Sequence, residues 1–210
     1  MADVGTRRSR LKSDRRSLLL QAAERQFAER GYLAVRLEDI GAAADVSGPA
    51  IYRHFPNKEA MLVELLVGIS ARLFDGGRAV VDEAGDNAAA ALAGLVDFHL
   101  DFAFGEPDLI RIQDRDLSQL PAGALRQVRR SQRQYVEVWV RVLRDLHPGL
   151  DEADARLTAH ATFGLINSTP YSTKPTGGKP VGSTSHSRAV LRAMTVAALD
   201  WAGGDPRPTG

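Results

Sequence analysis

Apolar residues recur every three or four positions along most of the 210-residue chain, the spacing that places them on one face of an α-helix. Glycine, proline and small polar residues interrupt this pattern and mark the ends of the helices. No stretch alternates between apolar and polar residues as a half-buried β-strand does. The pattern predicts an all-α protein with nine helices, at about 13–30, two within 37–55, and then 58–81, 88–104, 108–120, 121–147, 151–168 and 185–202.

Two of these helices are short and are joined by a tight turn within residues 36–60. The apolar face of the first consists of Leu37, Ile40 and Ala44. The small side chain of Ala43 is expected to let another helix approach closely. Asp45 stands where the chain must turn and where a positive φ is needed, which Asp tolerates better than most residues. Val46 can then fill the space beneath the turn.

The second short helix has a clear start and end. Ser47 is a good N-cap and Pro49 lies in the first turn, where its missing N–H does no harm. Pro56 ends the helix. Ile51 and Phe55 point to the core, which leaves an outer face of Gly48, Pro49, Ala50, Tyr52, Arg53 and His54. This is the outline of a helix-turn-helix, whose second helix enters the DNA major groove.

The charge distribution favours the same interpretation. The net charge is only +1, but residues 1–60 have a balance of +3 and the remainder a balance of −2. Six cationic residues lie near the N-terminus: Arg7, Arg8, Arg10, Lys12, Arg15 and Arg16. A basic arm can neutralise phosphates and release counterions, and a disordered solvated tail is the less favoured interpretation of the charge alone. The adjacent helix-turn-helix favours DNA.

Residues Phe27 to Leu66 resemble the N-terminal domain of TetR-family transcriptional regulators. The resemblance rests on the Phe–x–x–x–Gly–Tyr entry, the Val–Ser turn, the Tyr–x–x–Phe end and the following Asn–Lys–Glu. It covers about a third of the chain. The sequence departs from the family at Val35-Arg36, where Ser or Thr caps the helix, at Asp45, where Gly is common, and at Gly48-Pro49, where Lys–Gly is frequent.

The resemblance implies a homodimer that binds a palindromic operator and responds to a small molecule. The expected organisation is a basic flexible arm at 1–12, a DNA-binding domain at 13–57, a helical ligand-binding and dimerisation domain at 58–203 and a flexible tail at 204–210. Residues 170–183 are rich in Pro, Gly and Ser and are expected to form a loop.

Specific roles follow for the DNA-binding residues. The arm residues Arg7, Arg8, Arg10 and Lys12 are expected at the backbone or minor groove. Phosphate contacts are expected from Arg36, Ser47, Tyr52, His54 and Lys58. Base contacts are expected from Arg53 and from the small edge of Gly48, Pro49 and Ala50.

The resemblance also implies a ligand pocket and a dimer interface in the body. The pocket candidates are Phe74, His99, Phe102, Gln113, Tyr135, Trp139, Phe163 and Asn167. Aromatic walls with a few polar groups suit a small-molecule site, but a buried polar pair within an ordinary core explains the same residues equally well. The interface candidates are Ala161, Leu165, Leu191, Met194, Ala198 and Trp201.

The residue types and their spacing argue against a catalytic site and against a site for a metal or other cofactor. The chain has no cysteine, which excludes disulfides and thiolate chemistry. The five histidines lack metal-ligand spacing. His99 lies two residues from both Asp97 and Asp101, so the three side chains point to different sides of a helix. The apolar runs are too short to span a bilayer and no secretory signal is found, so a cytoplasmic protein is expected.

The sequence therefore predicts a DNA-binding repressor released by a small hydrophobic ligand. A transcriptional activator, or a DNA-binding protein insensitive to ligands, fits the same features. A helical small-molecule-binding protein without DNA function is a further alternative. An acyl thioester is suggested by the resemblance of the body to lipid-responsive members. A cationic ligand would require buried carboxylates, for which Asp97, Asp101, Asp114 and Asp116 are the candidates.

Overall fold

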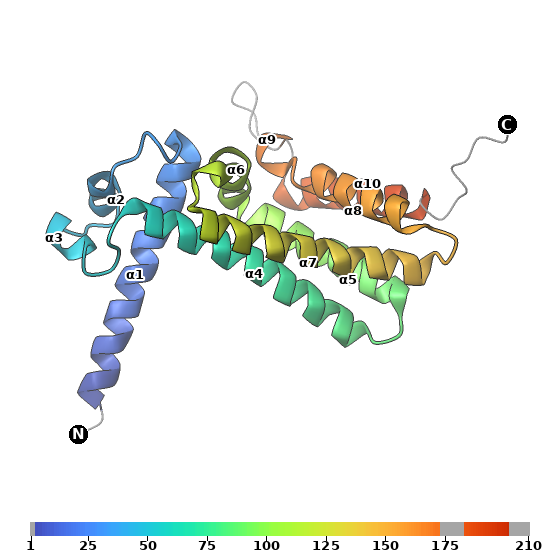
Figure 1. Cartoon of the computed structure of the whole chain (residues 1–210), viewed down its shortest axis with the longest axis horizontal. Coiled ribbons are helices and arrows are strands. Elements are labelled where there is room, and N and C mark those ends of the chain that lie inside the picture. The colour runs from blue at the N-terminus through green and yellow to red at the C-terminus, as the bar shows by residue number, and fades with distance from the viewer. Residues whose placement is uncertain (1–2, 173–182, 202–210) are drawn as a thin grey trace. The chain divides into compact units, whose positions relative to one another are not determined.

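The computed structural model describes residues 3–172 and 183–201, and describes side chains within 13–172 and 183–200 (Figure 1). The described residues form helices and connecting turns, which confirms the all-α prediction. The chain forms two compact units. The first contains residues 1–69 and 111–127, and the second contains residues 70–110 and 128–210. This division differs from the predicted boundary at residue 57, because α4 contributes to both units and residues 111–127 join the first.

The first helix is longer than the sequence pattern predicts. α1 spans Asp3–Arg30, so residues 3–12, expected as a flexible arm, have helical backbone. Most residues between Thr6 and Asp14 are good or tolerable helix formers, with no proline to stop the helix at Ser13. The helix buries Leu19, Ala22, Ala23 and Phe27. Gly31, with a φ of 85°, ends it as predicted, because this left-handed conformation suits glycine.

The turn between α2 (Leu37–Ala43) and α3 (Gly48–Ile51) matches the prediction in most details. Asp45 has a φ of 53°, and Val46 is buried beneath the turn. The close approach of the two helices, however, is made at Gly41 and not at Ala43, which is exposed. A Cβ at Gly41 would overlap the side chain of Ile51 and crowd the carbonyl oxygen of Val46. Only glycine fits at this point.

The caps of these two helices differ from expectation. Ser47 occupies the N-cap of α3, but its hydroxyl makes no capping hydrogen bond. At α2 the missing Ser or Thr is partly replaced by Asp39, whose carboxylate accepts the Arg36 N–H at 3.1 Å. Arg30 also donates to Asp39, at 3.2 Å. The Arg36 hydrogen bond, helped by the charges of Arg30 and Arg36, lowers the pKa of Asp39.

Helices make up most of the remaining described chain. They are α4 (Lys58–Ala84), α5 (Ala88–Gly105), α6 (Pro107–Asp116), α7 (Ala122–Leu146), α8 (Glu152–Ile166), α9 (Thr169–Ser172) and α10 (Thr184–Trp201), with a short 3₁₀ turn at Leu117–Gln119. The predicted helices are all present, and α9 adds one turn of helix in the segment expected as a loop. Residues 173–182 of that segment and the predicted tail at 204–210 lie outside the described residues.

The second unit is built around α5, which packs against α8, α9 and α10. On its other side α5 meets α4, where Gly76 lies directly against the ring of Phe98. α5 is also, by length and composition, a candidate membrane span among the described residues. Its buried residues, which include Leu95, Val96 and Leu100, belong to the hydrophobic core of the unit, so it is a core helix.

An ion-pair network attaches α10 to α5. Arg192 donates to both carboxylate oxygens of Asp97, at 2.8 and 3.0 Å. Arg188 lies between Asp97, at 3.3 Å, and Asp101, at 2.7 Å. The hydrogen bond from Arg192 is the main reason that the pKa of Asp97 lies below its usual value. Two of the four aspartates considered for a cationic ligand, Asp97 and Asp101, are therefore already paired.

We expect Asp97→Asn to lower the Tm at pH 7 by about 2–4 °C, which corresponds to about 1 kcal/mol for a partly exposed network. The folded protein stabilises the ionised carboxylate, so this contribution is complete above the pKa of the unfolded chain and is lost as the pH falls through the lower folded pKa. Thermal melts of both proteins between pH 7 and pH 3 check this.

The matched control is Asp145→Asn, at an exposed α7 carboxylate for which the described residues show no ion pair. Its Tm is expected to stay close to that of the wild type. A Tm difference for Asp97→Asn that remains constant down to pH 3 would contradict the ion-pair explanation.

Candidate DNA-binding and effector-binding sites

The predicted DNA-reading face lies at the surface of the first unit. Tyr52 is 57% exposed, and Ser47, Pro49 and Arg53 are also exposed. Gly48, Ala50 and His54 are partly exposed. No atom lies within 4 Å of a Cβ built at Gly48, so the first turn of α3 is open on that side. The segment thus presents one aromatic hydroxyl, one guanidinium and a small-residue edge that a groove can approach closely.

Arg16 of α1 holds this face in place. Its guanidinium forms a two-pronged ion pair with Glu64 of α4 and donates to the carbonyl oxygen of His54 at 2.6 Å. The same group lies over the Phe55 ring, 4.0 Å from its centre. One charged group therefore joins α1, the end of the helix-turn-helix and α4. The sequence suggested only an N-terminal positive charge for Arg16.

Lys58, expected at a phosphate, is turned toward the protein. Its ammonium group donates to the carbonyl oxygens of Tyr32 at 2.8 Å and Val35 at 2.9 Å, and lies 4.3 Å from the centre of the Tyr32 ring. These contacts hold the segment between α1 and α2. The structure therefore gives Lys58 a structural role, in which its ammonium donates to backbone carbonyl oxygens, and its phosphate contact stays a prediction.

Arg115 and Asp116, at the end of α6, attach to the same segment. The Arg115 guanidinium donates to the carbonyl oxygens of Phe27 and Ala28 in the last turn of α1. Asp116 is 4% exposed and accepts the Tyr32 N–H at 3.3 Å. Arg115 and Asp116 also form the ion pair expected in this charged segment, at 3.0 Å. No local sequence pattern predicts these contacts, because Arg115 and Asp116 lie far along the sequence from Phe27, Ala28 and Tyr32.

The other predicted DNA ligands divide into two groups. Arg36 is exposed at the start of α2, where its side chain is available to a phosphate. Arg7, Arg8, Arg10 and Lys12 lie on the helical backbone of α1, and their side chains lie outside the described residues. The exposed cations of the helix-turn-helix itself are thus Arg36 and Arg53.

Most predicted effector ligands meet in the second unit. The rings of His99 on α5, Tyr135 and Trp139 on α7, and Phe163 on α8 contact one another, and Phe102 on α5 contacts His99, with ring centres 5.0–6.3 Å apart in these pairs. We call this group, with Asn167, the aromatic cluster. Glycine helps to build it, because Gly77 of α4 lies against the Tyr135 ring. The sequence prediction missed Gly77.

A hydrogen-bond chain runs through the aromatic cluster. His99 Nε2 lies 3.1 Å from Asn167 Oδ1, and the Tyr135 hydroxyl lies 3.3 Å from His99 Nδ1. Burial lowers the pKa of His99 to about 4, so the imidazole is neutral at pH 7. The network then assigns the proton to Nε2, which donates to Asn167, while Nδ1 accepts from Tyr135. Burial also raises the pKa of Tyr135.

Trp139 contributes an unused hydrogen-bond donor to the cluster. The side chain is 0% exposed, and its indole N–H, although near the Tyr135 hydroxyl, makes no hydrogen bond of ordinary geometry among the described residues. A buried donor without an acceptor costs about 1–3 kcal/mol, so this N–H is the group in the cluster that an acceptor oxygen would stabilise. An uncharged ligand with a carbonyl group fits this chemistry better than an ion, since the imidazole beside it is neutral.

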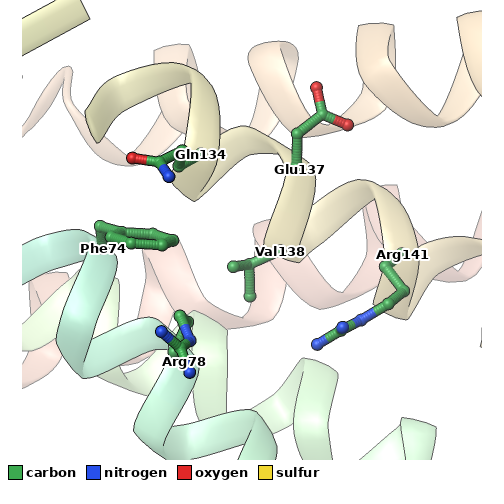
Figure 2. A pocket seen from close by; sticks show the side chains of 6 residues that line it. All are labelled: Phe74, Arg78, Gln134, Glu137, Val138 and Arg141. Atoms are coloured by element: carbon green, nitrogen blue, oxygen red, sulfur yellow. The ribbon is translucent and has the colours of Figure 1, made fainter. Parts of the chain in front are cut away.

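Two predicted effector ligands lie elsewhere. Gln113 belongs to the part of α6 assigned to the first unit. Phe74 lines a separate groove between α4 and α7, with a volume of about 330 Å³. The groove residues are Phe74, Arg78, Gln134, Glu137, Val138 and Arg141 (Figure 2).

The predicted dimer residues share α8 and α10. Ala161, Met194 and Ala198 are exposed and Leu165 is partly exposed. Leu191 is instead buried in the core of the unit, and the side chain of Trp201 lies outside the described residues. Leu157 at 67% and Val190 at 43% exposed extend the surface and were missed. Apolar side chains exposed on two packed helices are typical of an interface.

Two observations concern the excluded chemistry. No group of three His, Asp or Glu side chains that could hold a metal occurs among the residues with described positions. Of the acidic residues considered for a cationic ligand, Asp116 is also engaged, with Tyr32 and Arg115.

Two family models match the chain. Residues 19–65 match the bacterial regulatory proteins of the tetR family, and residues 85–180 match the tetracyclin repressor-like C-terminal domain. The HTH-type transcriptional repressor KstR2 of Rhodococcus jostii (strain RHA1) is 41% identical over 85 residues, which cover 40% of this chain and 41% of that protein. The match thus spans about two fifths of the length of this curated relative.

Solved structures share the fold over nearly the whole chain. The ketosteroid transcriptional regulator KstR2 of Mycobacterium tuberculosis is 26% identical with a TM-score of 0.71, covering 89% of this chain and 93% of that one. AibR, solved with isovaleryl coenzyme A and operator DNA, is 18% identical with a TM-score of 0.68, covering 86% and 97%. With a family-specific head and a family-specific body both matched, the chain belongs to the TetR family of DNA-binding transcriptional regulators, which are not enzymes.

Proposed function

We propose that the protein is a homodimeric repressor that leaves a palindromic operator when a small hydrophobic ligand binds its second unit. The observation that carries the DNA part is the exposed Tyr52–Arg53 face beside the open first turn of α3. One relative, 41% identical over 85 residues, is named a transcriptional repressor, which supports repression, whereas another, 36% identical over 90 residues, is named an activator.

The DNA contacts divide by chemistry. Arg53 is proposed to read a base, because an exposed guanidinium next to small residues can reach the edge of a guanine. Pro49 and Ala50 can contact thymine methyl groups. Phosphate contacts are proposed for Arg36, Ser47, Tyr52 and His54, and for the cationic residues of the first turns of α1: Arg7, Arg8, Arg10 and Lys12.

Dimerisation is proposed through the exposed apolar residues of α8 and α10, chiefly Leu157, Ala161, Val190 and Met194. A single helix-turn-helix contacts few bases, whereas two heads joined by a two-fold axis read both halves of a palindrome. The body therefore fixes the distance between the half-sites.

The proposed effector site is the aromatic cluster. Its rings supply apolar contact, and the Trp139 N–H and the His99–Tyr135–Asn167 chain supply a few polar groups. The relatives point to carbonyl-bearing ligands, since one is named a ketosteroid regulator and another was solved with isovaleryl coenzyme A. We propose a hydrophobic ketone or thioester, with its oxygen at Trp139.

Three other functions compete with this proposal: an activator, a regulator insensitive to ligands, and a helical binding protein without DNA function. A gel shift with the DNA that flanks its own gene separates the last of these, because family members often regulate neighbouring genes. In vitro transcription from the same DNA, with and without the protein, then separates repression from activation.

Replacing Arg53 with Ala is expected to relax base preference at one position of each half-site by about 1–3 kcal/mol. Titrations against operators mutated one position at a time measure this. Tyr52→Phe is the matched comparison, because it removes a hydroxyl proposed to contact a phosphate and should weaken binding to every sequence alike. Equal weakening of all sequences by Arg53→Ala would remove Arg53 from the base-reading group.

Effector and operator are expected to weaken each other by the same factor, because both draw on one conformational equilibrium. For a coupling of about 1–3 kcal/mol, the dissociation constant of the effector should rise about 5–150-fold when saturating operator DNA is present. Calorimetric titration of the effector with and without operator measures the change. Identical affinities in both titrations would show that the protein is not a ligand-released regulator.

A further inference from the structure

We propose that the groove between α4 and α7 binds the anionic end of an amphiphilic effector, with Arg78 and Arg141 as its two cationic ligands. The inference rests on the proposed effector binding and adds the charge of the ligand. The groove lies wholly within the second unit and has a volume of about 330 Å³, which suits a small-molecule group rather than a folded partner.

The two arginines have charges that the protein leaves unneutralised. Both side chains are exposed, and the described residues show no ion pair for either. Arg78 extends over Phe74, with its guanidinium 5.7 Å from the ring centre. In Figure 2 the guanidinium of Arg141 points toward the side of the groove formed by α4. Two guanidinium groups on opposite sides of one groove provide several N–H donors for carboxylate or phosphate oxygens.

The one carboxylate in the groove lining is used elsewhere. Glu137 forms a two-pronged ion pair with Arg156 of α8, which also binds Glu152 at 2.8 Å. The carboxylate of Glu137 points away from Arg78 in Figure 2. Hydrogen bonding to Arg156 lowers the pKa of Glu137, so its charge is held by this pair over the physiological range. The groove therefore keeps a local excess of positive charge.

The other groove residues favour an amphiphile over a simple ion. Phe74 and the buried Val138 form an apolar surface between the arginines, and Gln134 adds an amide. The groove and the aromatic cluster both involve the same two helices, α4 and α7. Gln134 and Val138 are the chain neighbours of Tyr135 and Trp139, and Tyr135 packs on Gly77, between Phe74 and Arg78 in sequence. An acidic end in the groove thus leaves the apolar end of a ligand near the cluster.

The test compares two probes that differ in charge. 8-Anilinonaphthalene-1-sulfonate is an apolar ring system with a sulfonate, and N-phenyl-1-naphthylamine has the same rings without it. Fluorescence titrations of the full chain in the absence of DNA give the two affinities. We expect the double variant Arg78→Gln/Arg141→Gln to bind the sulfonate at least about tenfold more weakly and the neutral probe unchanged.

Arg129→Gln is the control for the loss of a surface arginine outside the groove. Arg129 is exposed on α7, nine residues before Val138, which at 100° per residue places it on the opposite face of the helix. This variant should bind both probes as the wild type does. Equal losses for both probes, or equal sulfonate affinity in all three proteins, would overturn the proposal.

Competition identifies the source of the acidic group. Displacement of the sulfonate probe by dodecanoate indicates a carboxylate ligand, and displacement by coenzyme A indicates the phosphates of a thioester conjugate. Failure of both competitors would overturn the anion site. The proposed function is tested separately, by operator release. A hydrophobic effector that releases DNA equally well from the wild type and from the double variant would refute the anion site and leave the repressor function intact.

Discussion

The segment between α1 and α2 is the point on which the DNA-binding unit depends, because side chains from two distant parts of the chain hold its backbone. Lys58, the first residue of α4, donates hydrogen bonds to the carbonyl oxygens of Tyr32 and Val35. At the end of α6, Arg115 donates to a carbonyl oxygen in the last turn of α1, and Asp116 accepts the Tyr32 N–H. Buried backbone groups must be paired, so these contacts fix where α2 begins. They also give α4 and α6 direct attachment to the helix-turn-helix.

These attachments suggest how the second unit can affect the first without a residue whose only role is signalling. α4 and α6 each contribute residues to both compact units. Under the proposed function, a ligand that prefers one arrangement of these helices in the second unit would change the free energy of the contacts that Lys58, Arg115 and Asp116 make in the first. Coupling needs only such a difference in free energy between two states, and it acts in both directions.

The same contacts revise the electrostatic picture. The positive balance of the first 60 residues suggested a surface that attracts DNA, yet Arg16 and Lys58 are used inside the unit. The exposed cations of the helix-turn-helix are then Arg36 and Arg53, joined by the charges on the first turns of α1. Because α1 begins at Asp3, those charges are carried by helical backbone, which limits the ways in which they can reach a groove.

Local rules predicted the features that depend on local geometry. The positive φ of Asp45, the buried Val46 and the Ser47 cap position follow from the steric needs of a tight turn, and apolar spacing alone predicted the helices. Gly41, Gly77, Lys58 and Arg115 were missed because their roles arise from residues far away in the sequence. A glycine in a helix is unremarkable until the ring or methyl group that packs on it is known. A lysine at a helix start suits phosphate or carbonyl oxygens equally, and only tertiary contacts decide.

In the second unit, the sequence alone does not distinguish a ligand site from a hydrophobic core, because both use the same residues. Tyr135 and Trp139 lie on a helical stripe that either role explains, and packing alone would satisfy both rings. What distinguishes the aromatic cluster is an unmatched polar group, the buried Trp139 N–H, beside a histidine whose own two nitrogens are fully partnered. In the groove the distinguishing feature is likewise an imbalance, two guanidinium groups beside a carboxylate already bound to Arg156. A core selected only for stability would tend to remove such imbalances, whereas a site that binds its ligand reversibly must keep them in the free state.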